Sequence, residues 1–550
     1  MTTRSETTRS EEHPGPTVPP RRRARFSARA AAARWPDLLR RWAVPAVAMA
    51  VALVAMIAVS GRAPGGVGTV AAAGAVAAAL VIAGLRDPRW AFVFLIVATF
   101  LRPAIPKILP TTDPFILAFG GLLIATVAWI RGRPDRRVSL GAIECAMALY
   151  LLWNVNSIVQ EHEYRPILYP LSGQELDLWR YLIIGTGIPF ATYLISRIIF
   201  RTRESLRFLL LTLLACSAYS ALVSILQFHG PRALVWPRYI VLAPAWPERA
   251  VGLPNQPEVN GLILIAGYVL ALVLIGSERR SRAQRVLLAV IAAACAYAVF
   301  LTHTRSIWLD FAVVVVLGMV LGKGYRTGFV VTALGTVSII AMNWTDFTSS
   351  DRTSGGVTST NEVYDRLNAN ATAVWAFLEK PWSGWGLGRF VQVNTYRHQQ
   401  WSPDTPWERG LGIPAHETEL GILAELGIIG LLLWLTVLVL LAHRLITAYL
   451  RLPPAGITGR PLAFIAVTAF LSLALAGLFV DLRLFDYPST MVFALIGAAV
   501  GAADRLERGT PRDPLAAGRE RRAAIRARKL ETAAADQPRI GGTEVRNTPA

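Results

Sequence analysis

The chain is 550 residues long, and 53% of them are hydrophobic while only 17% are charged. A soluble chain of this length carries about a quarter charged residues and divides into several domains, so an ordinary soluble multidomain protein is excluded. The formal net charge of +20 would suit nucleic-acid binding, but most of the excess lies in the two tails and in short loops. We therefore expect a polytopic membrane protein that sits in a lipid bilayer and binds no nucleic acid.

The two ends of the chain are polar and basic, and they flank one long apolar body. Residues 1–41 and 502–550 are predicted to be disordered cytoplasmic tails, and residues 42–501 to be the transmembrane body. The first apolar run is a full span that follows a long basic segment, so we expect a retained helix and no cleaved signal peptide. The three cysteines lie far apart in apolar runs, which indicates neither a disulfide framework nor a zinc site.

Apolar runs of roughly 20 residues predict membrane spans. The sequence contains about 14 of them, and a count of about 10 to 14 is compatible with the runs. We therefore predict an all-α polytopic membrane fold. The candidates lie near residues 43–60, 66–84, 88–104, 114–131, 139–159, 180–200, 205–227, 259–276, 284–302, 305–322, 327–343, 418–443, 462–481 and 484–501.

Alternate loops of this prediction are basic, as at residues 131–137, 201–207 and 277–285. Lysine and arginine are about three times as dense in these loops as in the others, which predicts that both termini lie in the cytoplasm. The remaining loops are then extracytoplasmic, and three of them are too long to be simple connections: 160–179, 228–258 and 344–417.

The longest external segment contains the stretch NEVYDRLNANATAVWAFLEK, which has apolar residues at helical spacing. A helix here would lie on the outer membrane surface or cap a cavity, and a plainly packed lid is the alternative. The residues that would form its apolar face are Val363, Leu367, Ala371, Val374, Trp375 and Leu378.

Four external arginines lie near the predicted membrane boundaries: Arg180, Arg249, Arg305 and Arg366. Arg305 stands between two apolar runs with almost no loop, and a charge at membrane depth costs roughly 2.5–3.5 kcal/mol. A guanidinium in such a place suits a phosphate, because its forked donors bind two oxygens at once. The alternative is an interfacial arginine that extends towards lipid headgroups.

His416 lies where the long loop re-enters the membrane, and Glu425 follows inside the next apolar run. The histidine is a candidate general base with a pKa near neutrality, or else an ordinary surface histidine. Glu425, like Asp310, is expected to face the protein interior and to pair there, which a purely structural role would also explain.

The sequence has no phosphate loop, dinucleotide fingerprint, HExxH, DxD or CxxC pattern, so we expect neither a cofactor nor a metal. The glycine-rich GWGLG at 384–388 lies in an external loop without a preceding strand, which argues against a nucleotide site. Because nucleotide sugars are not supplied outside the cytoplasm, a glycosyl donor would have to be activated on a lipid.

Residues 249–443 resemble the O-antigen ligase and O-antigen polymerase family of membrane glycosyltransferases, which has a fold similar to the GT-C class. Three features in order carry the resemblance: ERAVGLPNQPEVNGLILIAGYV, FLTHTRSIWL, and the long loop from YDRLNANATAVWAFLEKPWSGWGLGRF to AHETELGILAELGIIGLLL. Two departures are Glu417, where the family often has asparagine, and the extra His303 before Arg305.

The resemblance implies a metal-independent, inverting transfer at the outer face of the plasma membrane. The donor would be a glycan on undecaprenyl diphosphate, and the acceptor a hydroxyl of another glycan or of a lipid-linked sugar. Arg249, Arg305 and Arg366 would hold the diphosphate, His416 would accept the proton, and Glu425 and Arg180 would support the site. Candidate protein partners are a chain-length regulator and a flippase.

Three other functions remain open at this point. A flippase of lipid-linked glycans would need charges along a path across the whole membrane, whereas here the candidates gather in the outer half. The absence of a visible internal repeat also weakens a transporter. A peptidoglycan polymerase of the shape-and-division type would use a loop carboxylate such as Asp351 or Asp365, and a scaffold would use none of these residues.

Overall fold

The structure is a computed structural model of the whole chain. It describes residues 83–84, 87–104, 114–131, 140–167, 175–242, 244–246, 248–278, 280–350 and 361–507. The predicted span at 43–60, nearly all of the one at 66–84, the N-terminal tail and the C-terminal tail beyond Glu507 lie outside the described residues.

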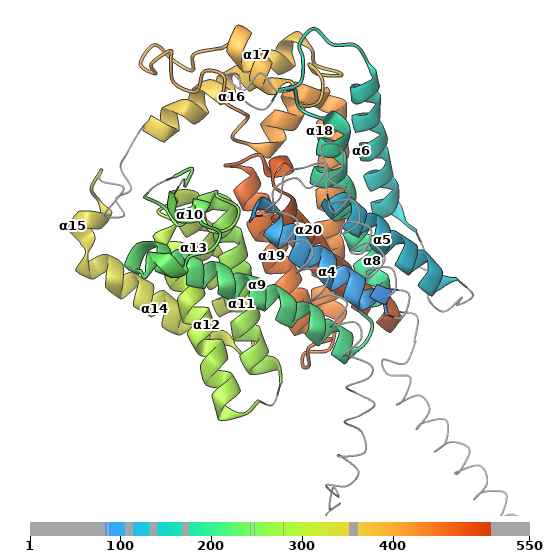
Figure 1. Cartoon of the computed structure of the whole chain (residues 1–550), viewed down its shortest axis with the longest axis vertical. Coiled ribbons are helices and arrows are strands. Elements are labelled where there is room, and N and C mark those ends of the chain that lie inside the picture. Colours follow the sequence, from blue (N-terminus) through green and yellow to red (C-terminus); the bar gives the residue numbers. More distant parts are fainter. Residues whose placement is uncertain are drawn as a thin grey trace, which may run out of the picture.

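The described residues form helices and no strand, which confirms the predicted all-α fold (Figure 1). Each predicted span in the described part of the chain corresponds to one helix or to consecutive helical segments. The α-helices are α4 Pro88–Leu101, α5 Pro114–Ile130, α6 Ala142–Val159, α7 Leu178–Leu182, α8 Ile188–Ile199, α9 Arg203–His229, α10 Tyr239–Leu242, α11 Pro257–Ser277, α12 Arg282–Leu301, α13 Arg305–Leu321, α14 Arg326–Met342, α15 Trp344–Phe347, α16 Asn361–Glu379, α17 Phe390–Tyr396, α18 Thr418–Arg451, α19 Arg460–Gly477 and α20 Asp486–Glu507.

Within the described residues, eight helices are long and apolar enough to cross a membrane. One of them runs without a break from α7 through a π-helical turn, Ile183–Gly187, into α8. Two shorter apolar helices, Ala118–Ile130 and Arg326–Met342, add to these. The chain is therefore a multi-pass membrane protein by length and composition, while the number of about 14 spans stays a prediction.

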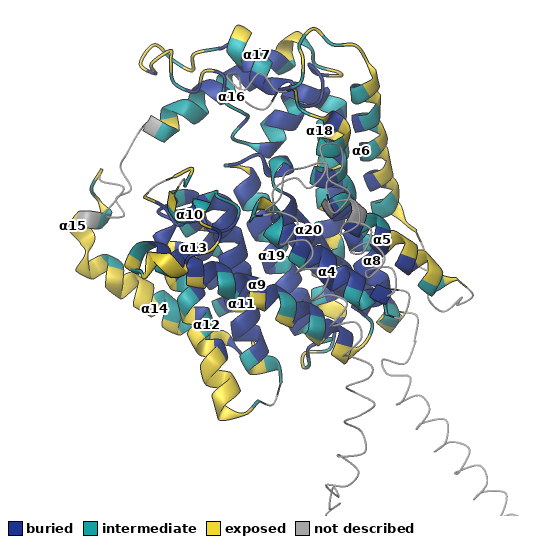
Figure 2. Ribbon diagram, in the orientation of Figure 1, coloured by how far each residue is buried: buried dark blue, intermediate teal, exposed yellow. Residues whose placement is uncertain are grey.

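The helices divide into a buried centre and a lipid-facing periphery (Figure 2). Of the 18 most apolar consecutive residues of each helix, 89% are buried in α11 and in α20. In α6 and α12 the buried share is only 28% and 33%. Large apolar side chains on the outer helices, such as Leu152 and Val290, are exposed. An apolar surface of this kind is stable only in contact with hydrocarbon, as expected for a membrane body.

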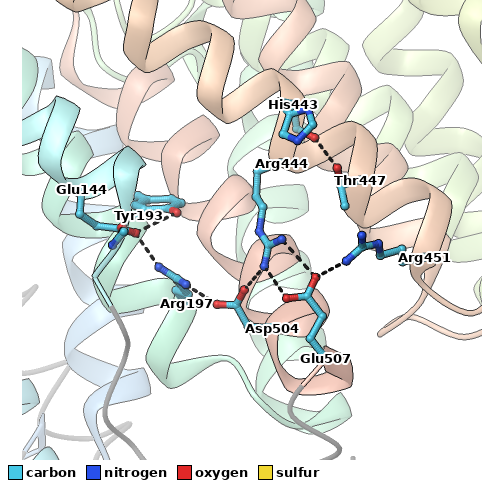
Figure 3. Close-up of polar contacts among 10 residues, drawn as sticks. Glu144, Tyr193, Arg197, His443, Arg444, Thr447, Arg451, Asp504 and Glu507 are labelled. Atoms are coloured by element: carbon cyan, nitrogen blue, oxygen red, sulfur yellow. Dashed lines mark hydrogen bonds and ion pairs between the residues drawn. The ribbon is translucent and has the colours of Figure 1, made fainter.

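Two glycines allow α20 to lie directly on α8. A Cβ atom added at Gly497 would lie 2.2 Å from the carbonyl oxygen of Tyr193, and one at Gly501 would lie 2.5 Å from that of Arg197. Small residues at a helix–helix contact let two backbones approach closely, which is a common device in membranes. The contact continues at one end of the bundle as a network of ion pairs through Arg197 and Asp504 (Figure 3).

Helix α18 contains a break that the predicted continuous span did not anticipate. Gly427 has φ 66° and ψ −170°, so a short helical segment precedes it and the long segment to Arg451 follows it. A Cβ added at Gly427 would lie 2.3 Å from the carbonyl oxygen of Trp382. The positive φ and the close backbone both require glycine, because other residues meet steric repulsion in this conformation.

Helices α16 and α17 lie across one end of the bundle, beyond α18 and α6 (Figure 1). The predicted helix over NEVYDRLNANATAVWAFLEK is confirmed as α16. Its predicted apolar face, however, is exposed or half-exposed, with Leu378 at 69%. The face packed inward is made of small residues, because the loop after α17 approaches the helix closely there. These inward residues are Asn368, Ala369, Thr372, Ala373 and Ala376.

Candidate active site

Three of the predicted site residues lie at or shortly before the first residue of a helix, and these helix ends lie at the same end of the bundle. Arg249 precedes α11, Arg305 is the first residue of α13, and His416 lies two residues before α18. The loop with Arg249 is tied to the turn before Arg305, since Ala250 N donates to Leu301 O at 2.8 Å. Residues from helices far apart in sequence thus meet beneath α16.

Arg249 has a buried guanidinium that is fixed from several sides. It forms an ion pair with Glu362, in the first turn of α16, and lies 4.9 Å from the ring centre of Trp246. The backbone carbonyl of Arg249 accepts a hydrogen bond from Gln227 Nε2 at 2.8 Å. The guanidinium is therefore held in one place by a carboxylate and an aromatic face, a setting in which arginine also binds phosphate.

Arg366 forms the reciprocal contact between α16 and the bundle. Its Nη2 lies 3.6 Å from Glu258 Oε1, in the first turn of α11, and its guanidinium lies 5.7 Å from the ring centre of Phe479. Glu258 is buried, and its Oε2 has no hydrogen-bond partner among the described residues. Two crossed ion pairs, Arg249–Glu362 and Arg366–Glu258, thus hold the first half of α16 on the bundle.

His416 lies within electrostatic reach of this cluster. Burial above all, and then the positive charge of Arg366, lower the pKa of His416 to about 4, against the opposing charges of Glu362 and Asp481. Within the described part of the chain, neither imidazole nitrogen makes a hydrogen bond. A histidine with this pKa is neutral at pH 7, which is the form that accepts a proton.

Arg305 lies half-buried at the start of α13, after a tight turn. In that turn His303 has a φ of 45°, its Nδ1 lies 2.9 Å from Glu248 O, and its ring packs edge-on against Phe228 at 5.5 Å. The extra histidine that distinguishes this chain from the family pattern is therefore a packed residue that fixes the turn. The free N–H groups at the start of a helix and the guanidinium both favour an anion near Arg305.

Glu425 faces the interior, where it is held between two segments. Its Oε2 accepts from Arg483 Nη1 at 2.8 Å and its Oε1 from Phe390 N at 3.2 Å. The GWGLG loop is also bound to the backbone of α18, because Gly386 N donates to Glu425 O at 2.8 Å. Glu425 thus anchors the long loop to the bundle and lies one side chain away from Asp481, the second partner of Arg483.

Arg180 lies in α7, on the Arg483 side of the site. The neighbouring ring of Tyr181 has its centre 5.9 Å from the Arg483 guanidinium. Asp177 caps the start of α7 by accepting from Arg180 N at 3.1 Å. Helix α7, which carries Arg180, therefore lies beside the Glu425–Arg483–Asp481 group, whereas Arg249 and Arg366 contact the α16 side.

Four charged residues of this end were not singled out from the sequence: Glu258, Glu362, Asp481 and Arg483. A signal was present for the last two, because DLR stands between two apolar runs and intramembrane charges are rare. Glu258 and Glu362 looked like ordinary first-turn helix residues. No group of three or more histidine, cysteine, aspartate or glutamate side chains suited to a metal ion occurs among the described residues.

Comparison with known proteins gives a family match within the chain. Residues 287–435 match a family model described as O-antigen ligase, and no curated protein matches the chain. The matched segment includes Arg305, Arg366, His416 and Glu425, while Arg180 and Arg249 precede it. The all-helical membrane body and this match support a glycosyltransferase-like role in surface polysaccharide biosynthesis. Residues 287–435 of the chain are thus similar to the O-antigen ligase family.

Proposed function

We propose that the protein transfers a glycan from an undecaprenyl-diphosphate donor to a sugar hydroxyl at the outer face of the plasma membrane. The observation that carries the proposal is the grouping of Arg249, Arg366 and a neutral His416 at one end of the bundle. Cations for a diphosphate and a base for a hydroxyl are the two chemical elements that such a transfer requires.

The distribution of basic residues supports an external position for this end. The opposite end carries the connections α8–α9, α11–α12 and α13–α14, each of which contains arginine or lysine, and the α18–α19 connection, which lies between Arg451 and Arg460. It also carries the network in which Arg444 pairs with Asp504 and Glu507 (Figure 3). Basic connections remain in the cytoplasm, so the end with His416 faces outward.

In the proposed reaction the donor diphosphate takes the place of carboxylates on the arginines. Glu362 pairs with Arg249, and its carboxylate would repel a diphosphate that approaches the same guanidinium. The donor phosphate therefore displaces Glu362 and pairs with Arg249, Arg366 and Arg305. Each charge-assisted hydrogen bond of this kind contributes roughly 1.5–3 kcal/mol.

His416 then activates the acceptor. As the acceptor oxygen bonds to the anomeric carbon, its proton passes to the imidazole, and the bond from that carbon to the diphosphate oxygen breaks. The negative charge that develops on the leaving diphosphate is stabilised by the arginines, so no metal is needed at this step. Attack opposite to the leaving group inverts the anomeric configuration.

The exposed apolar stripe of α16 suits the lipid part of the donor. Val363, Val374 and Leu378 continue from the turn that carries Glu362 and Arg366. Both polymerase and ligase chemistry use the same donor and base and differ in the acceptor alone. We place the protein among the polymerases or ligases of a surface polysaccharide, with polymerisation favoured.

The test uses the full chain in nanodiscs with EDTA and undecaprenyl-diphosphate oligosaccharides from the native host, followed by mass spectrometry. Longer glycans on the same lipid identify a polymerase, and transfer to another acceptor identifies a ligase. His416→Ala is expected to lower the rate about 10²- to 10⁴-fold. The matched control is His443→Ala, at the opposite end of α18 (Figure 3).

A second pair of variants tests the diphosphate site. Arg249→Gln is expected to abolish turnover, while Arg165→Gln, an exposed arginine of the same external side, retains it. Full activity of both His416→Ala and Arg249→Gln would refute the proposed site. Movement of the donor between leaflets without turnover by the wild type would identify a flippase.

A further inference from the structure

The loop after α17 carries exposed aromatic rings that the proposed chemistry does not use. Tyr396 is 66% exposed, Trp401 55% and Trp407 52%. We name these three residues the aromatic platform. Large apolar rings in contact with water are unfavourable, and a group of them on one segment indicates an interaction surface.

The platform is held in register along α16 by a buried asparagine. Asn368 Oδ1 accepts from Trp401 N at 2.8 Å, and its Nδ2 donates to Pro406 O and to Arg409 O, both at 2.9 Å. One turn further, Thr372 Oγ1 accepts from Gln399 N at 3.0 Å. The loop backbone therefore follows α16 at fixed positions.

Two of the three rings of the platform are fixed as well. Trp407 packs edge-on against His398 at 4.9 Å, and His398 is buried with its Nε2 2.9 Å from Trp407 O. Tyr396 stacks on Tyr164 at 5.6 Å between ring centres, which leaves its other face open. A surface that is already ordered loses little conformational entropy on binding, which is how rigid tyrosine and tryptophan side chains serve in binding sites.

The platform lies on a different face of α16 from the apolar stripe that would contact the membrane. At 3.6 residues per turn, Asn368 and Thr372 point about 120° away from Val374 and Leu378. Helix α17, which ends at Tyr396, lies farther from the bundle than α16 does (Figure 1). The residues of α16 that hold the loop are therefore not those of the apolar stripe, so the platform and the stripe are separate surfaces.

The loop that carries the platform reaches the candidate active site at Arg409. Arg409 Nη2 pairs with Asp365 Oδ2 at 2.6 Å, next to Arg366 in the sequence. From Asp365 to Thr372 the helix rises about 10 Å, the length of a disaccharide. A glycan that starts at the reacting bond and runs along α16 would therefore meet the rings after its first sugars.

We propose that the aromatic platform binds the glycan chain beyond the sugars next to the reacting bond. This inference rests on the proposed function. Sugar rings present a face of C–H groups that packs on aromatic rings, while their hydroxyls bind polar side chains. Such polar side chains border the platform: Arg397, Gln399 and Gln400. The protein would then prefer long glycans to single repeat units.

The test compares donors with one repeat unit and with several repeat units on the full chain in nanodiscs. Trp401→Ala, Trp407→Ala and Tyr396→Ala are each expected to raise KM for the long donor roughly three- to tenfold. KM for the short donor and kcat for both are expected to stay unchanged. Trp401→Phe should retain most of the affinity, and Trp382→Ala, an equally exposed tryptophan beyond the platform, is the matched control.

A binding experiment separates this inference from the proposed function. Lipid-free oligosaccharide from the host polysaccharide is titrated against wild type and variants, with tryptophan fluorescence as the readout. If the oligosaccharide binds, the platform variants weaken this binding and the wild type shows no turnover, the platform is supported and the glycosyl transfer is refuted. Turnover whose KM is unchanged in the variants, or raised equally for short and long donors, overturns the platform.

Discussion

Arg249 and Arg366 each hold a carboxylate at the position where the proposed reaction needs a phosphate. The partners differ in their setting, because Glu258 is buried in the first turn of α11 while Glu362 is partly exposed in the first turn of α16. Glu362 can be hydrated when another anion takes its place on Arg249, whereas Glu258 would itself stay buried and unpaired if it left Arg366. In the proposed reaction, Glu362 would thus be the competitor that the donor replaces.

Glu362→Gln is therefore expected to strengthen binding of the diphosphate. Removal of the competing charge should raise the affinity for undecaprenyl diphosphate about three- to tenfold, since the arginine is then available without prior dissociation. Thermophoresis of the full chain in nanodiscs measures this affinity. Glu163→Gln, which removes an exposed glutamate of the external side, is the control and should change nothing. An unchanged or lower affinity of Glu362→Gln would contradict the displacement.

The low pKa of His416 predicts an unusual pH dependence. Because the neutral imidazole is the active form, kcat/KM should stay constant from pH 8 down to about pH 5 and fall below the pKa of about 4. An ordinary histidine would lose activity already below its usual value of 6.5. The profile is measured with the short donor under EDTA.

The same profile of Arg366→Gln tests the cause of the shift. Loss of the positive charge beside His416 raises its pKa, so the acid limb should move to higher pH even if the rate is low. If kcat/KM of the wild type already falls at about pH 6.5, another group acts as the base. In the unfolded chain the histidine binds its proton first, so the same shift costs stability as the pH falls from 6.5 to about 4.

At the scale of elements, the break in α18 connects the long loop to the bundle. Gly427 opens the helix at the level where Pro381 O accepts from Ile428 N at 2.8 Å. The GWGLG segment pairs with the preceding turn, and Glu425 adds the side-chain contact with Arg483. The position of the first segment of α18, which follows His416, therefore depends on its contacts with the long loop before it.

Gly427→Ala is expected to weaken this connection. The added methyl group meets the Trp382 carbonyl at a backbone φ of 66°, which should cost roughly 1–3 kcal/mol. The expected results are a lower Tm in detergent and a loss of turnover at temperatures where the bundle is intact. Gly335→Ala is the control, because nothing lies within 4 Å of an added Cβ there. Equal Tm values for both variants would show that the break is not under steric constraint.

At the scale of the whole molecule, two ends of different character are joined by the bundle. One end brings α11, α13, α16 and α18 together around His416. The other joins α6, α8, α18 and α20 through Glu144, Arg197, Asp504 and Arg444 (Figure 3). Asp504 accepts from both arginines at 2.5 Å, so this end is fixed by charges that stabilise one another.

The orientation predicts opposite labelling of two single cysteines. Of the described cysteines only Cys145 is exposed, so Cys145→Ser gives a suitable background. In it, Asp404→Cys in the loop after α17 should react with an impermeant maleimide in intact cells. Lys323→Cys, in the exposed connection between α13 and α14, should react only after permeabilisation. The reverse pattern would place the site in the cytoplasm and exclude a lipid-linked donor at the outer face.

Local patterns were enough to predict the helices. Each described span is an apolar run close to the length that crosses a bilayer, and α16 follows from apolar residues at helical spacing. Arg366 and His416 could be named in the same way, because charged or titratable residues at apolar boundaries are costly unless they have a function. The break at Gly427 could not, since its cause is the backbone at Trp382 and not the neighbouring sequence.

The sequence by itself determined the membrane class, the positions of the helices and the residue types at one end of the bundle. The tertiary structure alone decided which charges pair: Arg249 and Glu362 are 113 positions apart, and Glu425 and Arg483 are 58 apart. It also decided that α16 turns small residues inward and its apolar stripe outward. Periodicity tells which side chains share a face of a helix, but only the packing of distant segments determines what covers that face.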